Sequence, residues 1–173
     1  MTEDCRDTIG KPCPEMEIKL VDGELWLRSD SIMMGYYKDP EATAQVLRDG
    51  WYATGDLCRQ DAEGYLYLTG RKKNVIILSN GENVSPEEIE AAFLQCSKVK
   101  EVMVGVEEGL ICAAVYSHPN DRQDISDHVQ RYNGTVPFYK QVQKLRFLDT
   151  PFAKTEVGKL IRRSVLEVKP YDS

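Results

Sequence analysis

The sequence predicts an α+β protein in two parts: a small β-rich subdomain over residues 1–71, and a compact C-terminal domain over residues 72–173 with a short mixed or antiparallel sheet and about three helices. Three observations support this fold class. The first part consists mostly of short strand-like segments and turns. The cationic junction Arg71-Lys72-Lys73 follows it. Beyond this junction, longer apolar strands are mixed with amphipathic helices, as in a small α+β domain.

The first part begins with a β-hairpin. Residues 16–21 and 24–28 are strand-like, and Asp22-Gly23 between them is typical of a two-residue turn. Residues 32–37 are a candidate for a further strand. A short helix is expected over residues 40–48, because it starts with a proline, which is favoured at the first helical position.

The centre of the chain combines strands, a glycine turn and a capped helix. Residues 65–69 alternate between two faces, and the short β-branched run 75–78 also favours a strand. Asn80-Gly81 indicates a turn, since both residues tolerate positive φ. Ser85 is the candidate N-cap of the helix, with Glu88 as its partner in a capping box. The apolar stripe of this helix is Ile89, Ala92, Phe93 and Cys96.

The rest of the chain alternates strands and helices. Strands are expected over residues 99–106, 110–116 and 145–148. The helix between the second and third of these is capped by Asp121 or Asp124, and Asn133-Gly134 is expected to stop it. A last helix is expected from about Val157 to Val168.

Composition argues against several classes of function. The net charge of −6 disfavours a broad surface for nucleic acid or anionic membranes. No apolar run is long enough to cross a bilayer, and the polar start has no signal-peptide core, so a cytoplasmic protein is expected. The cysteines lack the spacing of a zinc site, so we expect reduced thiols and no metal site. They are Cys5, Cys13, Cys58, Cys96 and Cys112.

Four strings of residues stand in order along the chain. They are GELWLRSDSIMMGYYKDPEAT at 23–43, YATGDL at 52–57, GRKKNVIILSNGENVSPEEIE at 70–90 and PFAKTEVGKLIRR at 151–163. Together they resemble the adenylate-forming enzymes, which include acyl-CoA synthetases, peptide-synthetase adenylation domains and luciferases. The resemblance extends over nearly the whole chain.

This resemblance implies an acid–thiol ligase that works in two steps. A carboxylate attacks the α-phosphate of ATP to give an acyl-adenylate and pyrophosphate, and the thiol of CoA then displaces AMP. Residues 1–71 would end a large N-terminal adenylation domain, and residues 72–173 would form a mobile C-terminal domain hinged near Lys72-Lys73. The large domain, on the same or a separate chain, is the implied partner. It would carry the Mg ligands, the acid pocket and the phosphate loop, for which this sequence has no matching string.

The resemblance also assigns roles to five residues. Asp56 would accept hydrogen bonds from both ribose hydroxyls of the nucleotide, and Arg71 would contact the ribose and a nearby phosphate. Lys73 matches the hinge position, and Gly81 matches a loop that lines the pantetheine tunnel. Lys159 would neutralise charge on the carboxylate and the α-phosphate as they approach, a task that suits a mobile ammonium group.

Structural interpretations compete with these roles. Asp56 can be a turn aspartate after a glycine, Arg71 a solvated arginine at a strand end, and Gly81 a hairpin glycine. Lys159 can be a solvated lysine in the first turn of the last helix, although a helix N-terminus disfavours a cation.

Three functions are therefore compared for the whole chain. The first is the C-terminal part of an acyl-CoA ligase, inactive by itself because half of the ATP site would be missing. The second is a free-standing binding or regulatory module. The third is an adenylation domain that serves a carrier protein, for which aspartate in place of Lys73 is the more usual hinge residue.

Overall fold

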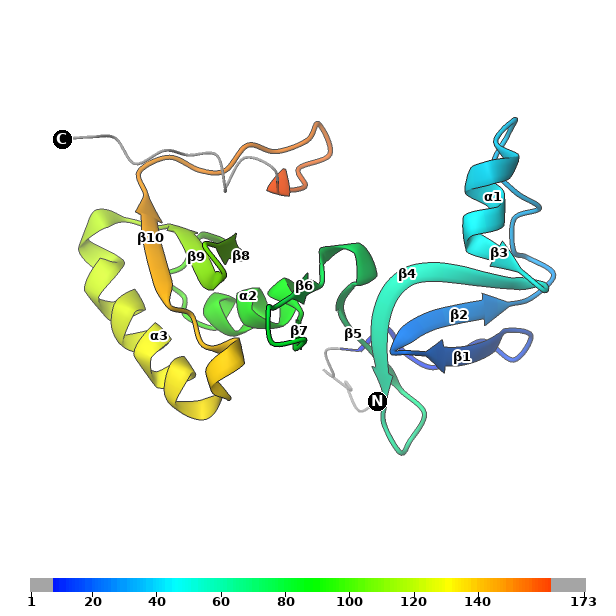
Figure 1. Cartoon of the computed structure of the whole chain (residues 1–173), viewed down its shortest axis with the longest axis horizontal. Helices are drawn as coiled ribbons and strands as arrows, with labels where there is room; N and C mark the ends of the chain where they lie inside the picture. Colours follow the sequence, from blue (N-terminus) through cyan, green and yellow to red (C-terminus); the bar gives the residue numbers. More distant parts are fainter. Residues whose placement is uncertain (1–7, 163–173) are drawn as a thin grey trace, which may run out of the picture. The chain divides into compact units, whose positions relative to one another are not determined.

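A computed structural model describes residues 8–162 of the chain (Figure 1). The chain divides after Asn74 into two units, and each unit has its own hydrophobic core. The predicted α+β class is confirmed: a curled antiparallel sheet is followed by a small mixed sheet with helices.

The first unit is built on an antiparallel sheet in the order β1-β2-β4-β3, with β5 also paired to β4. Its strands are β1 (Glu17–Val21), β2 (Glu24–Arg28), β3 (Leu47–Arg48), β4 (Trp51–Gln60) and β5 (Leu66–Arg71). The predicted first hairpin is confirmed. Asp22 and Gly23 have φ values of 51° and 79°, as a two-residue turn with positive φ at both positions requires.

The predicted short helix is α1 (Pro40–Val46). Asp39 Oδ1 accepts a hydrogen bond from Ala42 N at 2.9 Å, which caps the helix start. The helix ends two residues before the expected Arg48, because Leu47 and Arg48 pair with β4 as strand β3.

The strand expected over residues 32–37 is wrong. Gly35 at φ 151° and Lys38 at φ 55° turn the chain back on itself, so that Tyr36 bridges Asp39 instead of joining the sheet. The side chain of Thr43 also accepts a hydrogen bond from Tyr36 N, which ties this loop to α1.

The second unit contains a mixed sheet in the order β10-β9-β8. Strands β8 (Glu101–Glu107) and β9 (Leu110–Tyr116) are antiparallel, and β10 (Lys144–Leu148) is parallel to β9. A two-residue ladder, β6 (Ile76–Ile77) with β7 (Asn83–Val84), precedes them. The α-helices of this unit among the described residues are α2 (Pro86–Leu94) and α3 (Arg122–Thr135), and its 3-10 turns there are η2 (Pro119–Asp121) and η3 (Phe138–Lys140). A further 3-10 turn, η1 (Lys72–Asn74), ends the first unit.

The two faces of this sheet are covered differently. Both α2 and α3 pack on one face, where Ile89, Phe93 and Ile125 are fully buried. On the other face, Met103 of β8 and Ala114 of β9 pack against Phe152 of the C-terminal segment. Because side chains alternate along a strand, the same strands contribute side chains to the clusters on both faces of the sheet.

The capping box expected at the start of α2 and the stop expected near the end of α3 are both wrong. The Ser85 hydroxyl donates to Glu87 at 3.1 Å, and Glu88 pairs with Lys140 at 2.9 Å, so the expected capping box does not form. Helix α3 also continues through Asn133-Gly134. The Asn133 side chain bonds the backbone of Val142, and the helix ends at Thr135, two residues before Pro137.

The helix expected from Val157 does not begin there. Residues 155–159 form a hairpin turn, in which Gly158 N donates to Thr155 O and Thr155 N donates to Lys159 O, both at 2.8 Å. The rest of the expected helix, residues 163–168, lies outside the described residues.

Glu24 is a buried carboxylate at the centre of the first unit, with only 4% of its surface exposed. Its Oε1 accepts from Gly55 N at 3.1 Å, and its Oε2 accepts from Trp26 Nε1 at 3.1 Å and Lys72 Nζ at 2.8 Å. Burial by itself raises the pKa of Glu24, but the bonds from Lys72, Trp26 and Gly55 together outweigh it and lower the pKa below 4.5.

We expect Glu24→Gln to lower the free energy of unfolding of the first unit by about 2 kcal/mol at neutral pH, because a charged acceptor of three hydrogen bonds is lost. Both tryptophans lie in this unit, so tryptophan fluorescence during urea denaturation measures it selectively. Glu17→Gln is the matched control, since Glu17 pairs with Arg28 at the exposed end of the same hairpin.

The stabilities of the wild-type protein and Glu24→Gln should also depend differently on pH. Because the pKa of Glu24 is lowered on folding, its stabilisation is present above pH 4.5 and is lost as the pH falls through the lowered folded value. The stability difference between wild type and Glu24→Gln should therefore shrink in acid. A difference that stays constant down to the lowest folded pH would contradict this role.

Candidate functional site

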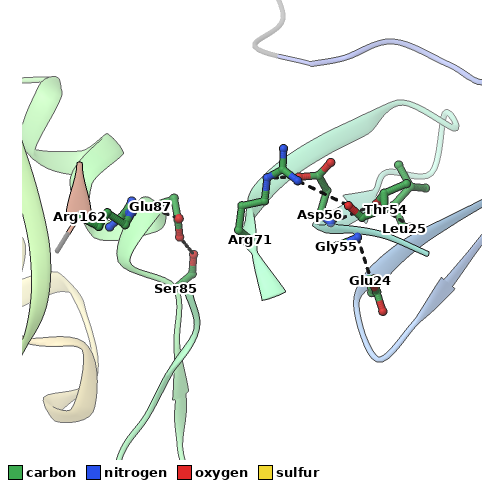
Figure 2. Close-up of polar contacts among 9 residues, drawn as sticks. All are labelled: Glu24, Leu25, Thr54, Gly55, Asp56, Arg71, Ser85, Glu87 and Arg162. Carbon is green, nitrogen blue, oxygen red and sulfur yellow. Dashed lines mark hydrogen bonds and ion pairs between the residues drawn. The ribbon is translucent and has the colours of Figure 1, made fainter. Parts of the chain in front are cut away.

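Asp56 and Arg71 meet across strands β4 and β5 of the first unit. They are direct register partners, and Arg71 Nε lies 2.7 Å from Asp56 Oδ1 (Figure 2). Arg71 Nη1 also donates to the backbone oxygen of Thr54 at 3.5 Å. Two of the residues singled out from the sequence are thus brought to one point.

The backbone around this pair is held by short polar contacts. Thr54 Oγ1 donates to Leu25 O at 2.8 Å and accepts from Asp56 N at 3.1 Å. Gly55 has φ 72° and donates its N–H to the Glu24 carboxylate (Figure 2). A Cβ at Gly55 would meet no atom within 4 Å, so the positive φ, and not lack of space, is what favours glycine there.

The ion pair is too exposed to be mainly a stabilising feature. The Arg71 side chain is 52% exposed and that of Asp56 is 24% exposed. Ion pairs of this kind contribute about 0–1 kcal/mol to stability, because water screens them. A carboxylate has about four acceptor positions, so Asp56 retains capacity to bind hydroxyl groups of a ligand beside its contact with Arg71.

A cleft of about 610 Å³ within the first unit is lined by Arg71 of this pair and by Thr54 and Gly55, which precede Asp56. Aromatic and cationic side chains contribute to its wall, among them Trp26, Tyr52, Arg48 and Arg71. Burial, followed by the charge and the hydrogen bond of Tyr36, raises the pKa of Tyr52 above its usual value. Such a wall suits a ligand that has both a flat ring and negative charge.

The two lysines after Arg71 differ in their surroundings. Lys72 pairs with the buried Glu24, whereas the Lys73 side chain is exposed. Both lie in η1 and both line the cleft. The division between the two units falls one residue after Lys73.

Gly81 lies at an exposed turn of the second unit. Its φ is 85°, and its N–H donates to Leu78 O at 2.9 Å. Asn80 Oδ1 accepts from Glu82 N at 3.1 Å, which closes the turn on its other side. A Cβ at Gly81 would meet nothing within 4 Å, so the outer side of this turn is open.

Lys159 is presented by the hairpin turn of the second unit, and its side chain is exposed. Lys159 N donates to Thr155 Oγ1 at 3.1 Å, and Gly158 has φ 79°. The bonds between Thr155 and Lys159 close a three-residue hairpin loop whose last residue, Gly158, lies in the left-handed region. No helix begins at Lys159, so the expectation that a helix N-terminus disfavours its charge is wrong.

Two charged residues, one in each unit, make buried or multiple contacts that the sequence did not predict. Glu24 follows a turn, and nothing in the local sequence indicates that it is buried. Arg162 ends the described chain and contacts two glutamates of α2. Its place in the fourth string, three residues after Lys159, is the signal that could have drawn attention to it.

The described residues supply no metal centre. Within residues 8–162, no group of three His, Cys, Asp or Glu side chains is placed to hold a metal ion. In the same range, no helix combines the length and apolar character that spanning a membrane requires.

Comparison with solved structures supports the fold. An O-succinylbenzoate CoA synthetase from Bacillus subtilis in complex with AMP matches with a TM-score of 0.78 and 29% identity over 92% of this chain and 35% of that chain. The same enzyme is also known with ATP and a magnesium ion. An amide bond synthetase from Marinactinospora thermotolerans matches with a TM-score of 0.75 and 29% identity over 92% of this chain and 36% of that chain.

Comparison with curated sequences points to the same group of enzymes. A long-chain-fatty-acid–CoA ligase of Haemophilus influenzae is 36% identical over 90% of this chain, and an indoleacetate–CoA ligase of Aromatoleum aromaticum is 38% identical over 84%. The chain spans about 30% of the length of these relatives. Residues 73–168 match the family of AMP-binding enzyme C-terminal domains. The chain therefore belongs to the AMP-binding, adenylate-forming enzyme family and is homologous to the C-terminal portion of its acyl-CoA ligases.

Proposed function

We propose that this chain is the C-terminal portion of an AMP-forming acyl-CoA synthetase, which activates a carboxylic acid as an acyl-adenylate and transfers the acyl group to CoA. The observation that carries the proposal is the Asp56–Arg71 pair, joined at 2.7 Å beside a cleft with aromatic and cationic walls. The proposal needs a large adenylation domain, on the same or a separate chain. We call the two together the assembled ligase.

In the assembled ligase, Asp56 and Arg71 bind the nucleotide. The Asp56 carboxylate accepts hydrogen bonds from the two ribose hydroxyls, since an ionised carboxylate is an acceptor with room for both. The Arg71 guanidinium holds Asp56 in place and has further N–H groups for ribose or phosphate oxygens. Magnesium ligation is assigned to the large domain, as the resemblance to adenylate-forming enzymes implies.

Lys159 acts in the first half-reaction. The barrier to adenylation includes repulsion between the substrate carboxylate and the α-phosphate, both of which are anions. A positioned ammonium group lowers this barrier by electrostatic stabilisation. The hairpin turn suits this role, because it presents an exposed lysine on a loop closed by three hydrogen bonds.

Movement between the half-reactions is assigned to the junction of the two units. We place the end of the adenylation domain at residues 1–71 and the mobile domain at residues 72–173, with Lys73 at the hinge. The exposed turn at Gly81 would then line the path of the pantetheine thiol, where the absence of a side chain leaves space. CoA is favoured over an amine as acceptor, since the curated relatives at 36–39% identity are named as CoA ligases or synthetases, and one of the solved structures at 29% identity is a CoA synthetase as well.

The isolated 173-residue chain should not catalyse ATP–pyrophosphate exchange with any carboxylic acid, because the acid pocket and phosphate loop would be missing. Adding the large adenylation domain, joined or as a separate chain, should restore exchange. The measurement is incorporation of labelled pyrophosphate into ATP. Exchange by the chain alone at the rate of a complete ligase would refute the proposal.

Asp56→Asn in the assembled ligase should weaken ATP binding by about 10- to 100-fold, the effect of losing hydrogen bonds to a charged acceptor. Stability should change little, since the ion pair with Arg71 is exposed. Isothermal titration with ATP measures the first effect and urea denaturation the second. Asp30→Asn, at an exposed aspartate of the same unit, is the control. Unchanged ATP affinity would refute the role of Asp56.

Lys159→Ala should reduce the rate of adenylation by about 100-fold or more, as expected for loss of a charge that stabilises the transition state. Thioester formation from a supplied acyl-adenylate should be nearly unaffected. Rapid-quench kinetics of the two half-reactions measure both rates. Lys98→Ala removes a half-exposed lysine of the same unit and should alter neither half-reaction. Equal loss of both half-reactions in Lys159→Ala would contradict the assigned role.

A further inference from the structure

Arg162 connects the hairpin that carries Lys159 to helix α2. Its guanidinium makes two bonds to Glu90, at 2.8 and 2.7 Å, and one to Glu87 at 3.2 Å. Figure 2 shows the Arg162 side chain meeting Glu87 at the start of α2. Burial lowers the pKa of Arg162, but the bond and charge of Glu90 and the charge of Glu87 raise it overall, so the group stays charged.

Glu90 also forms a hydrogen bond with the sheet. Glu90 Oε1, which accepts from Arg162, accepts the N–H of Val104 at 2.8 Å. Val104 lies in β8, which is an edge strand of the three-stranded sheet. Edge strands expose unpaired backbone groups, and here a helix carboxylate satisfies one of them. Arg162 thus joins the hairpin on one face of the sheet to the helix on the other, around the edge of β8.

The other strand of the hairpin is held separately. Glu101 accepts from Phe152 N at 2.9 Å and pairs with Lys154 at 2.5 Å. Phe152 is itself buried against Met103. These contacts fix the residues that enter the hairpin, whereas Arg162 fixes the residues that leave it.

Between these two anchors the strands of the hairpin pair through their backbones, and Leu160 packs against the cluster of Met103, Ala114 and Phe152. Ile161 N donates to Ala153 O at 2.9 Å, and Lys154 bridges Leu160. Lys159 therefore lies three residues from one anchor, on an exposed turn. A reacting group must be held within about 0.5 Å of its productive position, so residues that fix the strands of the hairpin also determine where Lys159 lies.

We propose that Arg162 is a positioning residue: through its bonds to Glu87 and Glu90 it fixes the exit strand of the hairpin and so the place of Lys159. This inference rests on the proposed function for its effect on adenylation. Its structural part, the anchoring of the hairpin, can be measured without any catalysis. Arginine suits the task, because its planar fork bonds two carboxylates in a fixed geometry that lysine does not reproduce.

The first experiment measures amide hydrogen exchange in the 173-residue chain. In Arg162→Gln, the amides of Gly158, Lys159 and Ile161 should exchange about tenfold faster, as expected from the loss of charge-assisted bonds. Amides of the β8–β9 ladder should keep their wild-type rates, which shows that the fold is intact. Arg162→Lys should recover protection in part. Wild-type exchange at the three hairpin amides would overturn the proposal.

Arg146→Gln is a matched control for this experiment. Arg146 has the same exposure as Arg162, 34%, and also pairs with a glutamate, Glu107. Glu107 is at the opposite end of β8 from Glu101, which anchors the hairpin. Exchange at the hairpin amides should therefore be unchanged in Arg146→Gln. An equal increase in both variants would show a general loosening of the sheet and would overturn the proposal.

The second experiment measures the two half-reactions in the assembled ligase. Arg162→Gln should lower kcat for adenylation by up to about 100-fold, because misplacement of a catalytic group by about 1 Å has this effect. The KM for ATP and the rate of thioester formation should stay near wild type. Combined with Lys159→Ala, it should cause no further loss, since Arg162 acts through Lys159. A full additional loss in the double variant would overturn the positioning role.

The two experiments separate the inference from the proposed function. If Lys159→Ala has normal adenylation, the proposed function fails, while hydrogen exchange still decides whether Arg162 anchors the hairpin. If Lys159→Ala is impaired and Arg162→Gln is not, the proposed function stands and the positioning role of Arg162 is refuted.

Discussion

The buried Glu24 carboxylate is the constraint on which the first unit depends. It lies where β2 begins and accepts hydrogen bonds from β2 itself, from Gly55 of β4 and from Lys72 after β5. A buried carboxylate without these donors would be strongly unfavourable, so folding has to bring the three segments together. Once Gly55 is fixed at positive φ, the next residue, Asp56, is directed to its register partner Arg71. The candidate nucleotide site is therefore a consequence of how one buried charge is satisfied.

In the second unit, a carboxylate likewise satisfies a backbone N–H: Glu90 accepts from Val104 of the edge strand β8. Helices α2 and α3 cover one face of the sheet, and the C-terminal hairpin covers part of the other through Phe152. Charged pairs at the margins, Glu101 with Lys154 and Glu90 with Arg162, fasten that hairpin at both of its ends. These pairs are partly buried, and each glutamate also accepts a backbone N–H, Glu101 from Phe152 and Glu90 from Val104, which makes their geometry more specific than that of surface ion pairs.

Local signals in the sequence were sufficient where neighbouring residues decide the structure. Asp22-Gly23 forms its turn because both residues tolerate positive φ, and Asp39 caps α1 through a residue three positions away. Expectations were wrong where a distant contact decides. Asn133 extends α3 instead of ending it, since its side chain bonds Val142, and the segment after Phe152 forms a hairpin because that phenylalanine packs on the sheet. The sequence strings named Asp56 and Arg71, but only the strand register brings them into contact.

The residues that stabilise the fold and the candidate functional residues are separate groups with different surroundings. Glu24 and Glu90 are largely buried and each accepts several hydrogen bonds, whereas Lys73, Gly81 and Lys159 are exposed. Exposed groups can reach a ligand, but they have few contacts of their own to fix their position. The two lysines therefore depend on buried neighbours: Lys73 adjoins Lys72, which bonds Glu24, and Lys159 lies between the two ends of its hairpin. Substitutions at the supporting residues should consequently alter both stability and function, while those at the exposed residues should alter function alone.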